Sequence, residues 1–433
     1  MCQPSRVLFA VLGLLSVTSG LQTKQQFRSE EFRVVYEWYK LDFTWPDESA
    51  KRTAFLSRRF VPQNNIISGI KIWMHKVFLT LPRWKEGVPA TLVTVPSIPV
   101  GPSASPRLEP FPSWEWQDIN NCSALQNVHA VEIDLDGILW VVDSGTSNEL
   151  EYPDYSCPPK LLQFNAETRE HYDTYTFPPG TINKDSILFD IVVDPRSRTA
   201  YISDSSETQP GIIVYRQGVS YKVTGGISMQ SDPSIGSIVV NGTEVRRQQN
   251  VGPLALSVVE RVLYFSPVTS HHLYSVHLSA LDRPGDISSS VRDLGRKLNS
   301  SSGMILDSKH VLYYGLLESN GIARWDSSRD PFSTGQRIIT EDAALLQWPC
   351  AFAFDQQRAL WVISNRFQTF LANTINLEVP NFRLIKAYTG TQSYLYANEP
   401  QSLSVSSSTA LQATSILFLL SICLSVKLLS NSM

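Results

Sequence analysis

The residues of this chain that could carry chemistry are two aspartates after β-prone runs and a group of histidines. Asp143 ends the run in "VVDSG" and Asp204 ends the run in "YISDS". Facing an interior axis, these carboxylates would bind an amine or another cation, but aspartate after a strand more often caps the following turn. His271, His272 and His277 lack the spacing of a zinc site, because His272 and His277 would point to opposite faces of a strand. We therefore expect no metal site.

No catalytic or cofactor-binding motif stands out. GxSxG, HExxH, the Walker loop and GxGxxG are all absent, so the sequence predicts no cofactor. The formal net charge is −3 over 433 residues, and the basic residues form no stripe. This charge pattern argues against nucleic acid as a partner.

The two ends of the chain differ from the middle. Residues 1–20, "MCQPSRVLFAVLGLLSVTSG", combine a basic residue, an apolar run and small residues. This pattern is typical of a secretory signal peptide and predicts a secreted, extracellular protein. Residues 401–433 are a Ser-rich segment followed by a hydrophobic tail. The tail resembles a GPI-anchor signal at the cell surface, with a true anchor helix or a disposable tail as alternatives.

Secretion also determines how cysteines and asparagines are interpreted. Three cysteines lie between the two end segments: Cys122, Cys157 and Cys350. An oxidising compartment favours one disulfide and leaves one thiol over. Three sequons predict N-glycosylation: Asn121, Asn241 and Asn299.

Residues 21–400 contain one repeated unit. Six β-prone runs share a form, and each follows another apolar strand and a turn: "VFLTL" (77–81), "ILWVVD" (138–143), "AYISD" (200–204), "VLYFSP" (262–267), "VLYYGL" (311–316) and "LWVIS" (360–364). The unit of strand, tight turn, strand, loop and strand recurs roughly every 50–60 residues, as in propeller blades with long loops. Strong helix signals are absent. The sequence therefore predicts an all-β fold, a six-bladed β-propeller.

A propeller ring needs a closing strand and offers a ligand pocket. We expect "FRVVYEWYKLDFTW" (32–45) to supply the closing strand, because the last blade of such a ring usually takes one strand from the other terminus. Loops at one end of the axis form a natural pocket for a small ligand.

Many motifs occur together in one order: "VVYEWYKLDFTWPDE", "VPQNNIISGIKIW", "VFLTLPRWKEGVPATL", "LWVVDSG", "CPPKLLQF", "IVVDPRSRTAYISD", "LYFSPVTS" and "LWVISNRFQTF". From about residue 32 to 388 the chain resembles the insect Yellow and major royal jelly protein family. The resemblance implies a secreted six-bladed β-propeller. Family members act in cuticle pigmentation, eggshell hardening and larval food, as amine binders in saliva, or as dopachrome-converting enzymes, so the fold transfers more safely than the activity.

The resemblance also assigns ligand residues. "SNRFQTF" (364–370) is similar to the stretch that contributes to the amine pocket of salivary members, which implies ligand contacts at Asn365 and Phe367. The amide would accept from an ammonium or hydroxyl group, and the ring would offer its face to a cation. Alternatively, Asn365 terminates a strand and Phe367 packs between blades. In a dopachrome-converting enzyme, Arg366 or a pocket histidine would assist proton transfer, but no residue stands out as the base.

Two further assignments rest on the resemblance. Cys122 and Cys157 match one of the two family disulfides. The second family bridge is absent, which leaves Cys350 either as a small buried residue or as a thiol near the pocket mouth or in a cross-link. "LDFTWPDE" (41–48) matches the family's N-terminal signature. We favour a packing role for its aromatic residues and a turn or cap role for its acids.

The sequence thus favours a secreted Yellow-like protein in cuticle or eggshell (chorion or vitelline membrane) formation or pigmentation. Its partners would be matrix components and a small aromatic amine or catechol. A dopachrome-converting enzyme and a biogenic-amine scavenger are the alternatives.

Overall fold

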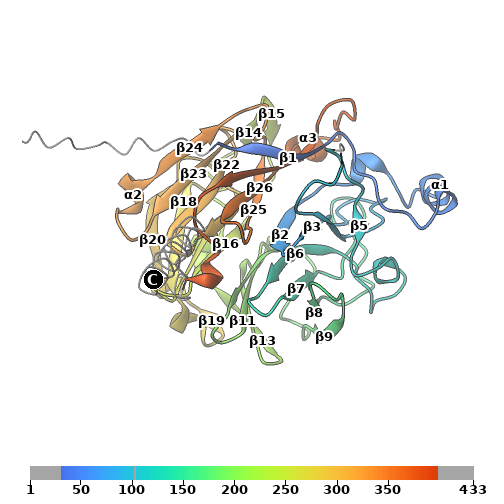
Figure 1. Ribbon diagram of the computed structural model, residues 1–433. Helices are drawn as coiled ribbons and strands as arrows, with labels where there is room; N and C mark the ends of the chain where they lie inside the picture. The colour runs from blue at the N-terminus through green and yellow to red at the C-terminus, as the bar shows by residue number, and fades with distance from the viewer. Residues whose placement is uncertain (1–30, 102–103, 398–433) are drawn as a thin grey trace, which may run out of the picture.

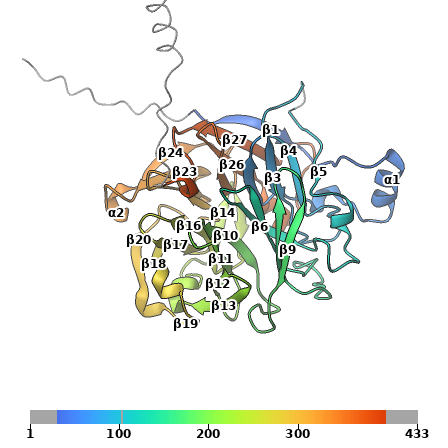
Figure 2. The same cartoon turned by 60° about the horizontal axis from the view of Figure 1, so that its bottom comes forward.

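The protein is a ring of six β-sheets, as the repeat predicts (Figures 1 and 2). The computed structural model describes residues 31–101 and 104–397. Each blade is an antiparallel sheet of four strands, and the third blade gains one short parallel strand at its outer edge. The six β-prone runs form the second strand of each blade, which confirms the predicted six-bladed β-propeller.

The strands of each blade follow one another along the chain, from the axis outward. Blade 1 consists of β2 (Gly69–Trp73), β3 (Lys76–Thr80), β4 (Leu92–Pro96) and β5 (Glu109–Pro110). Blade 2 consists of β6 (Val128–Ile133), β7 (Ile138–Asp143), β8 (Lys160–Asn165) and β9 (His171–Thr176). Blade 3 consists of β10 (Leu188–Asp194), β11 (Thr199–Asp204), β12 (Gly211–Arg216) and β13 (Val219–Thr224), with β19 (Gly285–Asp286) as the extra strand.

Blades 4 to 6 repeat this arrangement, except that the last blade takes its outer strand from the N-terminal side. Blade 4 consists of β16 (Val251–Ser257), β17 (Val262–Pro267), β18 (His272–His277) and β20 (Val291–Arg296). Blade 5 consists of β21 (Met304–Leu306), β22 (Val311–Leu316), β23 (Gly321–Asp326) and β24 (Arg337–Glu341). Blade 6 consists of β25 (Pro349–Phe354), β26 (Ala359–Asn365), β27 (Phe382–Tyr388) and β1 (Arg33–Trp38). A separate hairpin, β14 (Ile238–Val240) and β15 (Thr243–Val245), precedes blade 4.

The ring is closed by β1, as the sequence predicts. β1 pairs antiparallel with β27, and its blue ribbon lies beside the orange strands of the last blade (Figure 1). Tyr36 and Trp38 on this strand are 1% exposed, so the closure buries large apolar side chains. Each side chain of this size contributes about 1.5–3 kcal/mol when it is fully buried.

The innermost strands surround the axis. β2, β6, β10, β16, β21 and β25 each contact the inner strands of the two neighbouring blades. Both faces of an inner strand are therefore covered, which explains why β6 is buried at every position. A charged residue on such a strand must face the axis or find a partner, because an unpaired buried charge is costly.

Residues 31–101 and 104–397 contain three short α-helices: α1 (Glu48–Leu56), α2 (Phe332–Gly335) and α3 (Phe367–Leu371). Single turns of 3-10 helix occur as η1 (Pro62–Asn64), η2 (Glu115–Gln117), η3 (Gly226–Met229), η4 (Leu278–Leu281), η5 (Ser288–Ser290) and η6 (Tyr394–Tyr396). α1 was not expected from the sequence, and it projects from blade 1 (Figure 1). Within the described residues, we find no helix with the length and apolar character needed to span a membrane.

The "LDFTWPDE" stretch has the packing and capping roles expected of it. Leu41 and Phe43 are fully buried, and Trp45 stacks on Trp114 with ring centroids 4.9 Å apart. Asp47 is the N-cap of α1, where its Oδ1 accepts a hydrogen bond of 2.7 Å from the backbone N–H of Ala50. This strip is therefore architectural.

Candidate functional site

A pocket lies on the propeller axis, at the end where the inner strands begin. It is lined by residues of all six inner strands and by the loops around them, and its empty volume, mouth included, is about 980 Å³. Tyr394 of η6 lines its inner end, and η6 contributes to a second cavity on the opposite side. The pocket therefore has an open mouth and a floor at mid-depth.

Aromatic side chains form the rim of this pocket. Phe367 lies between Trp84 and Trp348, with ring centroids 5.0 Å and 5.1 Å away. The ring of His129 meets Trp84 edge to face at 5.8 Å. Trp84 and Trp348 lie in loops, His129 lies near the start of β6, and Phe367 is the first residue of α3. A rim of this kind can stack on a flat aromatic ligand and hold a cation over a ring face.

Asn365, at the end of β26, is 3% exposed and lines the same pocket. Its Oδ1 accepts a hydrogen bond of 3.0 Å from the backbone N–H of Phe367, and its Nδ2 donates to the carbonyl oxygen of Ile67 at 2.8 Å. The same amide nitrogen lies 3.3 Å from the Cys350 sulfur. The side chain thus positions Phe367 and joins blade 6 to blade 1. One lone pair of Oδ1 remains for a ligand.

The floor of the pocket carries charged groups from three blades. Lys71 Nζ lies 2.8 Å from Glu132 Oε2, and the Tyr394 hydroxyl donates to that same oxygen at 3.1 Å. Asp190 lines the cavity beside them and is only partly exposed. Burial raises the pKa of Asp190 to about 6, although the charge of Lys71 opposes this shift. The floor therefore combines an ammonium group, a fixed carboxylate and a carboxylate that titrates near neutrality.

A histidine and a glutamate form a second polar pair in the pocket wall. His129 Nε2 lies 3.0 Å from Glu149 Oε2, and both side chains are at most 10% exposed. Neither of these two atoms has a hydrogen-bond partner by strict geometry among the described residues. The hydroxyl of Ser144 donates to the other Glu149 oxygen at 3.1 Å. A histidine oriented by a carboxylate can exchange protons with a ligand.

Comparison with known proteins identifies the family of this chain. The family model described as "Major royal jelly protein" matches residues 126–393. The chain belongs to this family. Dopaminechrome tautomerase of Drosophila melanogaster is 28% identical, over 86% of this chain and 84% of that relative. Protein yellow of Drosophila yakuba is 27% identical, over 81% and 68%, and protein yellow of Drosophila melanogaster is 26% identical, over 88% and 73%.

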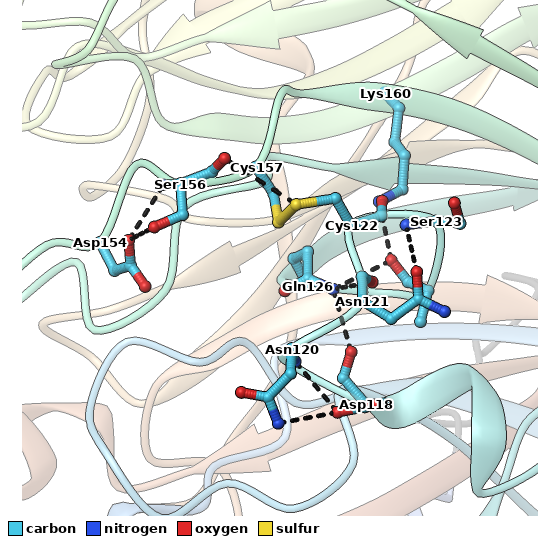
Figure 3. Close-up of a disulfide and its surroundings, with 12 residues drawn as sticks. Asp118, Asn120, Asn121, Cys122, Ser123, Gln126, Asp154, Ser156, Cys157 and Lys160 are labelled. Atoms are coloured by element: carbon cyan, nitrogen blue, oxygen red, sulfur yellow. Dashed lines mark hydrogen bonds between the residues drawn. A yellow bond between two sulfur atoms is a disulfide. The ribbon is translucent and has the colours of Figure 1, made fainter.

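The disulfide that the family resemblance implied is confirmed. Cys122 and Cys157 are bonded, 35 residues apart, with their Cα atoms 5.2 Å from each other (Figure 3). Cys350 is a free thiol that lines the pocket, where its Sγ lies 3.6 Å from the carbonyl oxygen of Ser68. Burial raises the pKa of Cys350 to about 12. The thiol is therefore protonated at neutral pH and a poor nucleophile.

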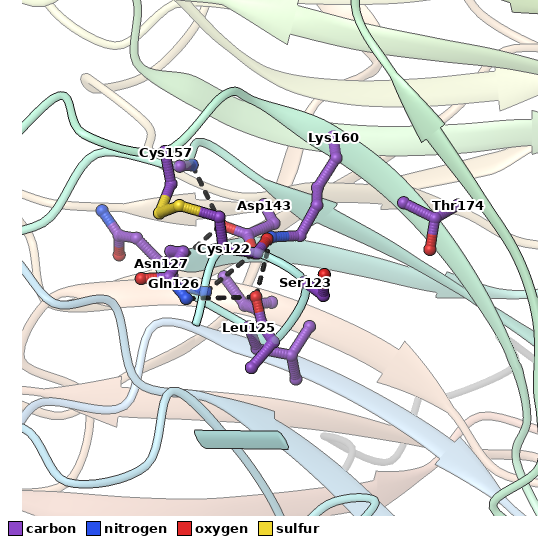
Figure 4. Close-up of polar contacts among 12 residues, drawn as sticks. Cys122, Ser123, Leu125, Gln126, Asn127, Asp143, Cys157, Lys160 and Thr174 are labelled. Carbon is purple, nitrogen blue, oxygen red and sulfur yellow. Dashed lines mark hydrogen bonds and ion pairs between the residues drawn. A yellow bond between two sulfur atoms is a disulfide. The ribbon is translucent and has the colours of Figure 1, made fainter. Parts of the chain in front are cut away.

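The structure places Asp143 outside the pocket lining. It is fully buried and accepts hydrogen bonds from the backbone N–H groups of Gln126, Asn127 and Gly145 at 2.8, 2.8 and 2.9 Å. Lys160 Nζ lies 3.2 Å from its Oδ2 (Figure 4). All of these contacts are internal, so the turn-capping alternative describes this carboxylate.

Asp204 has the same internal role in blade 3. Its Oδ1 accepts from the backbone N–H of Ser206 at 3.0 Å, and Lys222 Nζ lies 2.6 Å from its Oδ2. Arg366 is the residue before α3 and is partly buried, but it is not among the described residues that line the pocket. Burial and the like charge of Arg383 lower the pKa of Arg366.

Sequence reasoning missed the floor residues. Lys71 in "GIKIW", Glu132 in "VEI" and Asp190 in "LFDIVVD" are charged residues inside largely apolar inner strands. A charged residue inside an apolar inner strand could have indicated these positions, because inner strands have no solvent-exposed face. No group of three or more His, Cys, Asp or Glu side chains in the described part of the chain could hold a metal ion.

The predicted glycosylation sites lie at the surface to different degrees. Asn121 and Asn241 are exposed, and Asn241 occupies the turn between β14 and β15. Asn299 is partly exposed, and its Oδ1 accepts from the backbone N–H of Ser319 at 2.8 Å. The predicted signal peptide and C-terminal tail lie outside the described residues.

Proposed function

We propose that this protein is a secreted Yellow-like protein whose axial pocket binds a small catechol- or indole-derived aromatic amine during the pigmentation or formation of cuticle or eggshell. The observation that supports this proposal is the aromatic rim of Trp84, Trp348 and Phe367 above a floor that contains Asp190. An aromatic ring stacks on the rim, and an ammonium group gains roughly 0.5–2 kcal/mol over a ring face.

Calorimetric titration with dopamine, serotonin and a stable dopachrome analogue tests the proposal. We expect saturable binding of one ligand per chain with micromolar affinity, about −8 kcal/mol. Phe367→Ala should weaken this binding by at least tenfold, because it removes the ring between the two tryptophans. Tyr388→Ala is a matched control, because this aromatic residue is 67% exposed on β27 and does not line the pocket.

A second candidate function is the conversion of dopaminechrome. The relative named dopaminechrome tautomerase supports it, since that protein matches over 86% of this chain. A tautomerase needs a group that removes a proton from carbon and a group that stabilises the resulting negative oxygen. Turnover separates the candidates: an enzyme accelerates the loss of dopaminechrome, an amine scavenger only saturates, and a matrix protein does neither and becomes insoluble in the tissue.

The proposed location rests on sequence patterns and on the chemistry of the disulfide. The bond between Cys122 and Cys157 fits an oxidising compartment. We propose cleavage near Gly20 and a mature chain held at the cell surface by a GPI anchor. Mass spectrometry of the mature N-terminus tests the first point. Release of the protein from cells by a phosphatidylinositol-specific phospholipase tests the second, and retention of the protein after this treatment contradicts an anchor.

A further inference from the structure

We propose that the floor of the axial pocket is a proton-transfer site, in which Asp190 removes a proton from a substrate carbon and Lys71 stabilises the substrate oxygen that becomes negative. This inference rests on the proposed function, because a ligand must first occupy the pocket. It extends that function by naming the residues that would carry out the second candidate reaction, a cofactor-free prototropic shift. Its substrates are cyclic quinones derived from catecholamines.

Asp190 has the contacts of an available base. Its Oδ1 accepts a hydrogen bond of 2.8 Å from the N–H of Ile191, and its Oδ2 accepts one of 2.9 Å from the N–H of Leu254. These backbone donors hold the carboxylate in place and leave a lone pair on each oxygen. In the described part of the chain, Asp190 forms no ion pair within 4 Å, unlike Asp143 and Asp204. It is thus a partly exposed, unpaired carboxylate in a cavity.

Lys71 has the contacts of an oriented donor. Its Nζ donates to Glu132 Oε2 at 2.8 Å, and the lysine side chain is 17% exposed. An ammonium group has three hydrogens, so two remain for a ligand oxygen. Lys71 and Asp190 line the same cavity, and the charge of Lys71 acts on the Asp190 carboxyl. The pocket therefore presents a base and a cation to one ligand.

Glu132 and Tyr394 position the lysine. Glu132 is 2% exposed, and its Oε1 accepts a hydrogen bond of 2.9 Å from its neighbour Ile133. The hydroxyl of Tyr394 fixes the other oxygen and also contacts the backbone of Val193. Burial raises the pKa of Tyr394 well above its usual value, so this hydroxyl stays protonated and acts as a donor. We regard Glu132 and Tyr394 as positioning residues.

The proposed step balances without a redox partner. The carboxylate of Asp190 takes a proton from the saturated ring carbon, and the electron pair of the broken C–H bond moves through the conjugated ring to a quinone oxygen. Lys71 stabilises this oxygen, which then gains a proton from Lys71 or water, while Asp190 returns its proton to solvent. This first shift gives a quinone methide. In a second shift, a proton leaves the neighbouring saturated ring carbon and the other quinone oxygen gains a proton, which gives the aromatic catechol isomer of the substrate. A base with a pKa of about 6 is well matched to this task near neutral pH.

The test follows the tautomerisation of dopaminechrome by absorbance with the purified full chain. Asp190→Asn should lower kcat by about 10²–10⁴-fold, the usual contribution of a general base. A single cooperative transition in urea unfolding should persist, which shows that the variant remains folded. Asp173→Asn is a matched control, because this exposed aspartate lies on the outer strand β9, away from the pocket.

The pH profile of kcat/KM gives a readout that a structural role would not move. The wild-type profile should show an acid limb near pH 6, and Asp190→Asn should abolish it. The charged and titratable groups that act on Asp190 from the packed elements are Lys71, Glu132 and Tyr394. Lys71→Met should move the limb to higher pH, because Lys71 lowers the pKa of Asp190, and Glu132→Gln should move it to lower pH.

Each contrary outcome has a distinct meaning. Saturable binding of serotonin without turnover of dopaminechrome by the wild type overturns the proton-transfer site and leaves the binding function standing. Turnover that Asp190→Asn leaves within threefold of wild type, with the acid limb unchanged, also overturns it. If His129→Gln alone then abolishes turnover, the base is the histidine paired with Glu149. If the wild type shows no binding of serotonin and no turnover of dopaminechrome, both proposals are refuted.

Discussion

The Asn365 side chain gives the sharpest distinction between a ligand contact and a structural cap. Replacement by alanine removes two buried hydrogen bonds, one from the N–H of Phe367 and one to the carbonyl of Ile67. Each bond is worth about 0.5–1.5 kcal/mol, and a buried group left without a partner costs about 1–3 kcal/mol. We therefore expect Asn365→Ala to destabilise the protein by about 2–4 kcal/mol.

The loss of ligand affinity should be indirect. Without the hydrogen bond from its N–H to Asn365, Phe367 at the start of α3 should leave its place between Trp84 and Trp348. Urea unfolding followed by tryptophan fluorescence gives the change in stability, and calorimetry with serotonin gives the change in affinity. Asn365→Asp tests the donor separately, because its carboxylate keeps the acceptor for Phe367 but cannot donate to Ile67.

The refuting result is specific. If Asn365→Ala stays within about 0.5 kcal/mol of wild-type stability while affinity falls by tenfold or more, then the amide contacts the ligand directly and its capping bonds contribute little. If Asn365→Asp is as stable as wild type, the hydrogen bond to Ile67 is not a join between blades 6 and 1. Either result would contradict the reasoning from the hydrogen bonds.

Two further substitutions and one labelling experiment have defined outcomes. Lys160→Met leaves Asp143 buried without its cation, so urea unfolding should show a loss of about 3–5 kcal/mol, and a loss under 1 kcal/mol would contradict the pairing. Relative to Asp190→Asn, the wild type should gain about 1–3 kcal/mol of stability as the pH falls from 7 through 6 toward 4. The folded-state pKa of Asp190 is raised to about 6, so its ionisation opposes folding and protonation removes this cost. Cys350 should resist maleimide at pH 8 in the native protein and react in urea, because burial keeps its thiol protonated; rapid native labelling would contradict this.

The fold was largely predictable because it repeats. The β-prone run that forms β7 in blade 2 has a counterpart in each of the five other blades. One such run alone would be ambiguous, but six similar runs at a regular spacing identify it as a strand. The ring closure by β1 was predictable for a related reason, since a β-prone segment precedes the first unit. α1 was missed because its nine residues give no repeated signal. Its cap, Asp47, was nevertheless correctly interpreted as a turn or cap residue.

The site was only partly predictable. Asn365 is the last residue of β26 and Phe367 comes two residues later, so the resemblance could assign them as one local stretch. Lys71, Glu132 and Asp190 come from three blades and span about 120 residues of the chain, so only the closed ring brings them to one cavity. A sequence pattern reports the neighbours of a residue along one strand, whereas the floor depends on neighbours across strands.

One strand-end position shows how the repeat becomes specialised. Asp143, Asp204 and Asn365 all end the second strand of their blades, and each accepts a hydrogen bond from the backbone N–H two residues later. In blades 2 and 3 a lysine balances the aspartate: Lys160 is buried, and Lys222 is partly exposed. In blade 6 the neutral amide needs no lysine, and its extra donor binds the carbonyl of Ile67 instead. The backbone N–H that Asn365 binds belongs to Phe367, whose ring lies at the pocket rim. The same strand-end position that only caps a turn in blades 2 and 3 therefore holds an aromatic residue of the site in blade 6.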